Sequence, residues 1–232
     1  MFFRWSDDLS ADVELCCIQL PGRESRMREP LIDRLEDVVE RLSYYLLPLL
    51  DVPFAFFGHS MGSLISFETA RYLRRNHDRN LMHLFVSAHQ ACHLRTRFPP
   101  IHGLADADLV REIALRYRGI PAVILRDAEF LGAWLPVFRA DLTILESYVY
   151  QEDDPLACPL SAFGGSLDPV VAQEELAAWR EQTCNTFRLR TLAGDHFYFR
   201  TARGALVRAI QEDLAESRSA GMLRAVNQEA AD

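Results

Sequence analysis

One short stretch limits the folds open to this chain more than any other. It reads FAFFGHSMGSLISFETA over residues 54–70. An apolar run enters the sequence GHSMG, residues 58–62, and a helix-forming segment follows at once. Gly-x-Ser-x-Gly between a strand and a helix is typical of a sharp turn, in which the serine takes a strained backbone conformation and the glycines remove colliding side chains. The pattern predicts that the Ser60 hydroxyl stands exposed at the end of a strand.

Apolar runs alternate with amphipathic segments along the rest of the chain. The expected strands are 13–22, 53–58, 81–88, 160–168 and 186–194, and the expected helices are 30–50, 61–76, 170–182 and 201–217. This alternation favours an α/β fold with a mostly parallel sheet flanked by helices. Residues 103–150 break it with helical segments alone. We expect one domain over 1–232 in which 103–150 is a helical lid above the carboxyl edge of the sheet, where ligands bind.

Composition excludes several other classes of protein. The 232 residues carry a net charge of −8, which argues against bulk binding of nucleic acid. No apolar run has the length of a membrane span and the first residues do not resemble a signal peptide, so a cytoplasmic monomer is expected. The five cysteines show no paired spacing, so neither disulfides nor a zinc ribbon is indicated. Cys16 and Cys17 lie in an apolar run and are interpreted as core residues.

A serine nucleophile needs a base and an orienting carboxylate, which on such a sheet follow in the order Ser, Asp or Glu, His. His196 follows the last strand, and Asp168 follows the strand before it. Asp195 is adjacent to His196 in sequence and is expected to point away from it. The alternative for Asp168 is a helix N-cap. In the expected mechanism Ser60 attacks a carbonyl carbon, His196 transfers the proton, and Asp168 holds the imidazole.

The backbone N–H of Met61 completes the expected site. It follows Ser60 at the start of a helix, where positive dipole collects, and is predicted to stabilise an oxyanion. The remaining histidines give no competing site. His83 is interpreted as a core residue, and His89 and His93 flank Cys92 with no fourth metal ligand in view. No metal or cofactor is expected.

Several longer stretches resemble the type II thioesterases of nonribosomal peptide and polyketide synthesis. They include VELCCIQLPGRESRMREP, PFAFFGHSMGSLISFETA, PPIHGL, LPVFRADLTILESYVY, PLSAFGGSLDPVV and AGDHFYF, in the family's order over nearly the whole chain. The resemblance implies an α/β-hydrolase fold, a triad of Ser60, Asp168 and His196, and a mobile lid at 103–150. It also implies hydrolysis of acyl thioesters from the phosphopantetheine arm of acyl or peptidyl carrier proteins, which would be the partners.

The chain departs from the family's pattern in two places. HQACH, residues 89–93, replaces a stretch that usually contains arginines and ends in Ala-Pro. The family usually opens with another strand and an aromatic-Ala-Gly-Gly loop, whereas this chain is expected to begin inside the helix that follows. The additional strand would lie between 13–20 and 53–58, and the loop would supply a second oxyanion N–H. We therefore expect a shortened start and a chain that folds poorly or has low activity.

Two alternatives to an editing thioesterase follow. One is a chain-releasing or general acyl hydrolase that uses the same triad on other esters. The other is a non-catalytic protein that binds carriers. Arg71, Arg74, Arg75 and Arg79 are expected on the outer face of a helix, where they are either solvated or in contact with an acidic carrier. Asp153 and Asp154 are expected in an exposed, solvated turn.

Overall fold

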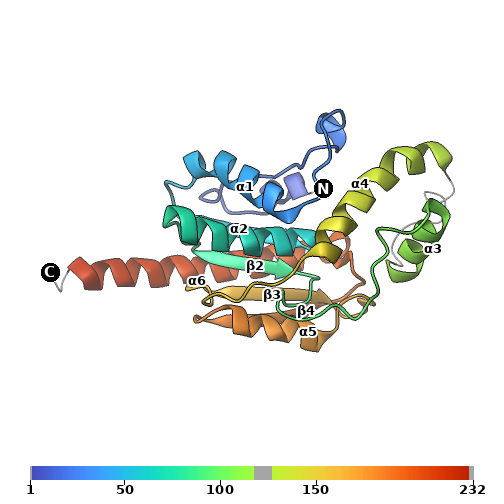
Figure 1. Ribbon diagram of the computed structural model, residues 1–232. Coiled ribbons are helices and arrows are strands. Elements are labelled where there is room, and N and C mark those ends of the chain that lie inside the picture. Colours follow the sequence, from blue (N-terminus) through green and yellow to red (C-terminus); the bar gives the residue numbers. More distant parts are fainter. Residues whose placement is uncertain (1, 118–126, 230–232) are drawn as a thin grey trace.

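A parallel four-stranded sheet forms the centre of the computed structural model, which describes residues 2–117 and 127–229 (Figure 1). The strands are β1 (Ala55–His59), β2 (His83–Ser87), β3 (Leu160–Gly165) and β4 (Phe187–Leu192), in the spatial order β1-β2-β3-β4. All positions of β2 and β3 are buried, as expected for the inner strands of a parallel sheet that is covered on both faces. The predicted α/β fold is confirmed.

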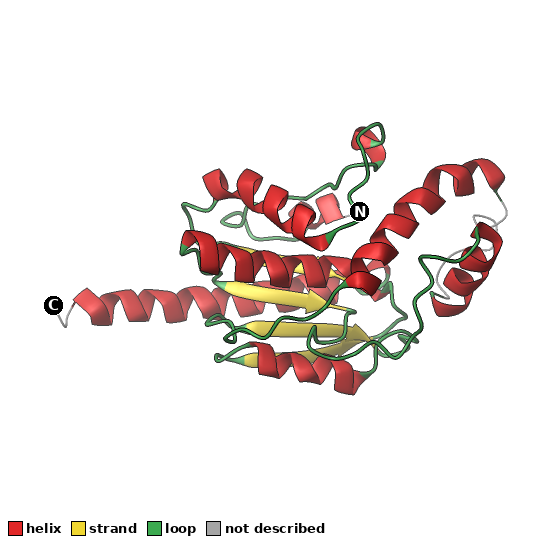
Figure 2. Ribbon diagram, viewed as in Figure 1, coloured by secondary structure: helices red, strands yellow, loops and turns green. Residues whose placement is uncertain are grey.

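Helices cover both faces of the sheet (Figure 2). The helices of the described ranges are α1 (Leu35–Leu46), α2 (Met61–His77), α3 (Asp106–Arg116), α4 (Ala128–Ser147), α5 (Gln173–Ala177) and α6 (Arg203–Glu229), of which α3 and α4 form the insertion between β2 and β3. Successive side chains of β2 point to opposite faces. Leu84 and Val86 pack with α1 and α2, whereas Phe85 packs with α6 and with Trp5 of a short 3₁₀ helix, Phe2–Asp7. The two resulting cores hold the sheet between its helical layers.

The strand expected at 13–22 does not form. Residues 13–20 have no regular secondary structure, and Cys16, Cys17 and Ile18 are exposed rather than in the core. A strand is stabilised by a ladder of hydrogen bonds to a neighbour, and none of the four strands in the described ranges pairs with this segment. The apolar composition of this run predicted a buried strand, but the run does not pair with the sheet.

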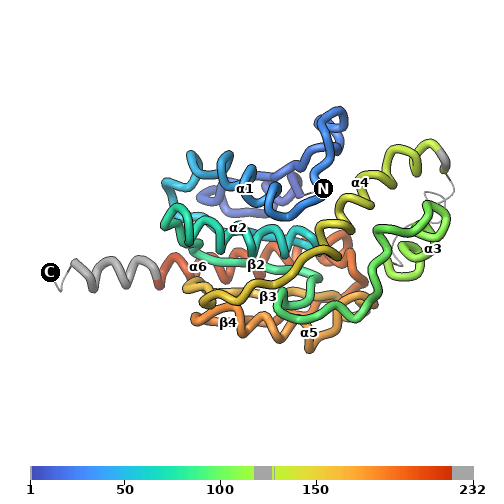
Figure 3. The backbone as a smooth tube through the Cα atoms, viewed as in Figure 1, coloured from blue at the N-terminus to red at the C-terminus, as the bar shows by residue number. Residues whose placement is uncertain are grey.

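The insertion between β2 and β3 extends beyond the carboxyl ends of the strands. The chain leaves β2, passes through α3 and α4, and returns along a loop to β3 (Figure 3). The expected helical content of 103–150 is confirmed for the described part, while residues 118–126 lie outside it. Of the helices in the described ranges, none is both long enough and apolar enough to span a membrane.

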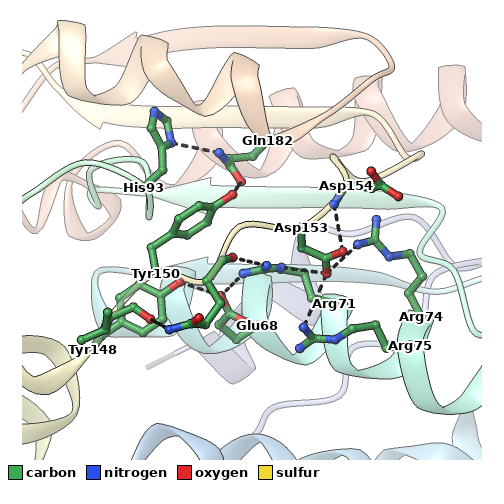
Figure 4. A network of polar contacts seen from close by, with 12 residues as sticks. Glu68, Arg71, Arg74, Arg75, His93, Tyr148, Tyr150, Asp153, Asp154 and Gln182 are labelled. Carbon is green, nitrogen blue, oxygen red and sulfur yellow. Dashed lines mark hydrogen bonds and ion pairs between the residues drawn. The ribbon is translucent and has the colours of Figure 1, made fainter.

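The outward position predicted for Arg71 is wrong. Its side chain is 2% exposed and donates to Glu68 at 2.6 Å and to the Gln151 carbonyl at 2.5 Å, and its guanidinium lies over the Tyr150 ring (Figure 4). The segment after α4 crosses α2 and covers this face. It also brings in Asp153, which contacts Arg71 and is only 20% exposed instead of lying in a solvated turn.

Arg74 and Arg75 also reach the Asp153 carboxylate, at 2.9 and 3.5 Å, and Tyr148 donates its hydroxyl to Glu68 at 2.6 Å (Figure 4). Partial burial acts to raise the pKa of Asp153, but the hydrogen bond from the Asp154 backbone and the nearby guanidinium groups outweigh it, and the pKa is lowered. The cluster thus fastens the segment that leads from the insertion to β3 onto the helix that begins beside Ser60.

Replacing one arginine of this cluster tests its contribution to stability. Arg71→Met removes the positive charge that pairs with the largely buried Glu68 carboxylate and leaves it only the Tyr148 hydroxyl, and we expect the free energy of unfolding to fall by about 3–5 kcal/mol. Arg75→Met is the matched control, because that side chain is 46% exposed and its loss should cost less than about 1 kcal/mol. Urea denaturation of both variants measures the difference, and equal effects would contradict a buried role for Arg71.

Candidate active site

Ser60 lies on the sharp turn that the GHSMG stretch predicts. Its backbone has φ 53° and ψ −121°, a strained conformation for a residue with a side chain, and its N–H donates to the Ser87 carbonyl at 2.7 Å. A Cβ atom on Gly58 would lie 2.0 Å from the Gly62 carbonyl oxygen. Glycine is therefore required at 58, so that the end of β1 can approach the first turn of α2.

The structure brings Ser60, His196 and Asp168 into one hydrogen-bonded chain. The Ser60 hydroxyl donates to His196 Nε2 at 3.1 Å, and His196 Nδ1 donates to Asp168 Oδ2 at 2.9 Å. His196 and Asp168 are both buried, with side chains 3% and 1% exposed. Their order along the chain and their contacts are those of a serine-hydrolase triad.

Asp168 also caps the turn that follows it, using its other oxygen. Oδ1 accepts from the backbone N–H groups of Val170 and Val171 at 2.8 and 3.3 Å, while Oδ2 faces His196. Asp168 can therefore both orient His196 and cap the turn that follows it. These bonds fix the carboxylate rigidly at the end of β3.

The loop that carries His196 lies directly against β3. A Cβ atom on Gly165 would approach the Asp195 carbonyl oxygen to 2.2 Å, so the close contact requires glycine there. The Asp195 carboxylate accepts from the Phe197 N–H at 2.8 Å, and Asp168 rather than Asp195 bonds the His196 ring. Sequence reasoning missed Gly165, although the Gly-Gly pair at the end of a predicted strand was the available signal.

Aromatic rings surround the His196 imidazole. The rings of Tyr117 and His59 lie with their centroids 5.3 Å from it. His59 Nδ1 bonds the Ser87 hydroxyl at 2.8 Å, and the Ser87 hydroxyl bonds Tyr198 at 2.6 Å. Burial, followed by the nearby His196, lowers the pKa of His59 well below its usual range, so this ring is neutral beside the site.

A cavity of about 220 Å³ opens beside Ser60. Its described lining consists of His59, Ser60, Met61, Gly62, Tyr117, Phe138, Asp141, Leu142, Leu145, His196 and Phe197. Met61 begins α2, where the first backbone N–H groups have no intrahelical acceptor, so its placement agrees with the predicted oxyanion donor. A larger cavity of about 340 Å³ lies at the amino ends of β2 and β3, at the other end of the sheet from this chemistry.

Ion pairs and hydrogen bonds hold the start of the insertion to α4. Glu146 of α4 accepts from the backbone N–H groups of Ile101 and His102 at 2.9 Å and from the His102 ring at 2.6 Å. Arg139 of α4 donates to the carbonyls of His102 and Leu104. The PPIHGL stretch is therefore the point at which the chain entering the insertion is fastened to α4.

Asp141 of α4 is a cavity residue that sequence reasoning did not select. It forms an ion pair with Arg23, which lies 118 positions earlier in the chain. The signal was an acid at 141 among apolar residues at 138, 142 and 145, which share a helix face. The histidines near Cys92 are directed elsewhere, since His89 Nδ1 bonds the Gln90 carbonyl and His93 Nδ1 bonds Gln182.

The fold and the Ser-His-Asp contacts define a serine hydrolase of the α/β-hydrolase class. Comparison with known proteins narrows this: a family profile described as "Thioesterase domain" matches residues 1–214, and the chain belongs to that family. Gramicidin S biosynthesis protein GrsT of Aneurinibacillus migulanus is 42% identical over 197 residues, which are 85% of this chain and 77% of the relative.

Solved structures give the same assignment. RedJ, a thioesterase from the prodiginine pathway of Streptomyces coelicolor, matches with a TM-score of 0.83 and 35% identity over 91% of this chain and 80% of its own. BorB, a type II thioesterase from the borrelidin biosynthetic cluster, matches with a TM-score of 0.80 and 31% identity over 92% of this chain and 85% of its own. The chain is thus a type II thioesterase of the kind found in nonribosomal peptide and polyketide pathways.

A methyl group at position 58 tests the turn. Gly58→Ala places Cβ against the backbone of Gly62, and we expect at least about 2 kcal/mol of destabilisation together with displacement of Ser60. Gly62→Ala is the matched control, because nothing lies within 4 Å of its Cβ position, and alanine is the better helix former by about 1 kcal/mol. Thermal denaturation compares the two, and a Gly58→Ala protein as stable as Gly62→Ala would refute the required close approach.

Proposed function

We propose that this thioesterase hydrolyses acyl groups held as thioesters on the phosphopantetheine arm of carrier proteins, and so clears stalled or misprimed synthases. The observation that carries the proposal is the hydrogen-bonded chain from Ser60 through His196 to Asp168, beside a cavity largely lined by apolar side chains. The relatives described above come from the biosynthesis of gramicidin S, prodiginine and borrelidin, which supports the substrate class.

The residues divide the reaction between them. Ser60 Oγ attacks the thioester carbonyl carbon while His196 Nε2 takes the hydroxyl proton, and Asp168 stabilises the resulting imidazolium. The Met61 N–H faces the developing oxyanion. The C–S bond then breaks, the thiolate leaves with the proton from His196, and an acyl-Ser60 ester remains. Water, deprotonated by His196, opens this ester to a carboxylic acid and restores the serine.

The insertion at 103–150 acts as a lid in this proposal, and 1–232 works as one domain. Residues of α4 form one wall of the cavity and Tyr117, at the end of α3, lies against the His196 ring, so the cover excludes water from the triad. A narrow space under a cover suits the long, thin pantetheine arm of a carrier. The leaving group is a thiolate, a better leaving group than an alkoxide, so the triad needs no metal.

The alternative enzyme function is a chain-releasing or general acyl hydrolase. The same triad would serve it, and the difference lies in dependence on the carrier. A purely carrier-binding role is less favoured, because Ser60, His196 and Asp168 are already within bonding distance of one another. The helix arginines also weaken the case for carrier binding, since Arg71, Arg74 and Arg75 pair with Asp153.

A comparison of substrates tests the proposal. We expect acyl-carrier protein to be hydrolysed with a higher kcat/KM than the same acyl group on coenzyme A or as a p-nitrophenyl ester, because only the carrier offers protein contacts. Ser60→Ala should abolish turnover and labelling by a fluorophosphonate, and Asp168→Asn should lower kcat by about 10⁴-fold.

Circular dichroism provides the control that the variants are folded. Equal rates on all three substrates would favour the general hydrolase. A folded protein that fluorophosphonate leaves unlabelled at Ser60 would favour carrier binding without catalysis.

A further inference from the structure

The cavity beside Ser60 contains one carboxylate among mostly uncharged groups. On α4, Phe138, Leu142 and Leu145 form an apolar wall, and Asp141 lies on the same helix face. A cavity that accepted only hydrocarbon chains would gain nothing from a carboxylate there, because removing an ion from water is costly. The presence of Asp141 therefore needs its own explanation.

Arg23, which lies outside the cavity, offsets the free-energy cost of removing the Asp141 carboxylate from water. Its guanidinium pairs with Asp141 Oδ1 and also donates to the Pro21 carbonyl at 3.0 Å, while Gln19 donates to the Arg23 carbonyl at 2.6 Å. Burial raises the pKa of Asp141, and the Arg23 guanidinium acts against that rise. The loop 19–29 thus holds the arginine on one side of the carboxylate.

The ion pair is oriented with its negative end toward the cavity. Asp141 is among the described lining residues, whereas Arg23 is not. Oδ1 bonds Arg23, and no hydrogen bond from the described residues reaches Oδ2. A carboxylate oxygen can accept two hydrogen bonds, so Oδ2 remains available to a donor that enters the cavity. Asp141 and Ser60 line the same cavity of about 220 Å³, so this oxygen faces the space in which an acyl group on Ser60 would lie.

We propose that Asp141 determines specificity by charge: it favours acyl groups that carry an ammonium beside the thioester carbonyl and disfavours those that carry a carboxylate there. The proposal rests on the thioesterase function proposed above and names the part of the substrate that Asp141 contacts. An ammonium donates to Oδ2 and is attracted by its charge, whereas a substrate carboxylate is repelled in a site that excludes water. A neutral branched chain has neither effect.

Three acyl groups of nearly equal shape separate charge from size. Alanyl, isobutyryl and methylmalonyl thioesters of N-acetylcysteamine carry an ammonium, a methyl group or a carboxylate on the same carbon. Their kcat/KM values are measured for the wild type and for Asp141→Asn, which keeps the shape and loses the charge. Dividing each variant ratio by the wild-type ratio cancels the intrinsic reactivity of each thioester.

We expect Asp141→Asn to lower the alanyl-to-isobutyryl ratio by about tenfold and to raise the methylmalonyl-to-isobutyryl ratio by a similar factor. Glu129→Gln is the control on the same helix, since Glu129 is exposed outside the cavity, and it should leave both ratios unchanged. If Asp141 only fastens α4 to Arg23, the three substrates will lose activity equally and the ratios will stay at the wild-type values, which overturns the proposal.

A second variant keeps the test decisive if Asp141→Asn fails to fold. Arg23→Met with Asp141→Leu replaces the whole ion pair by apolar side chains, an exchange that is often neutral or stabilising. We expect the same shifts in both ratios, and a folded double variant with wild-type ratios contradicts the proposal. A wild type that hydrolyses none of the thioesters, either free or on a carrier, would instead count against the thioesterase function itself.

Discussion

The whole site depends on how closely the backbone at the end of β1 approaches the first turn of α2. At Gly58 the space for a side chain is already occupied by the Gly62 carbonyl, and this contact forces Ser60 to φ 53°. The strained backbone of Ser60 thus lies at the candidate active site, where such conformations are commonly found. It turns the serine hydroxyl out of the sheet toward His196 and leaves the Met61 N–H at the open start of a helix. One backbone contact therefore positions both the Ser60 hydroxyl and the Met61 N–H.

The sequence was sufficient to predict the triad and most of the fold, because both depend on local signals. In a parallel sheet the carboxyl ends of the strands meet at one edge, so residues that follow predicted strands, such as Asp168 and His196, come together although 28 positions separate them. The alternation of apolar runs and amphipathic helices then gives the layers. Their catalytic roles remain predictions until the variants are measured.

What the sequence could not predict depends on contacts between distant segments. Helical periodicity predicts that Arg71 points away from the sheet. It cannot predict that the segment carrying Asp153, 82 positions later in the chain, covers this side chain. Residues 13–20 have the composition of a buried strand, yet strand formation requires a neighbour to pair with. The Arg23–Asp141 ion pair likewise joins two motifs that are visible in the sequence, but only the packing of α4 shows that they meet.

The attachments of the insertion also explain where a specificity group can be placed. Glu146 fastens the last turn of α4 to Ile101 and His102. Tyr148, the residue directly after α4, bonds Glu68 of α2, the helix that begins beside Ser60. The carboxyl end of α4 is therefore held to the helix that begins beside Ser60. Asp141 lies close to the held end. A charge there has a fixed place in the wall of the cavity that it shares with Ser60, which is what the proposed selection of acyl groups by charge requires.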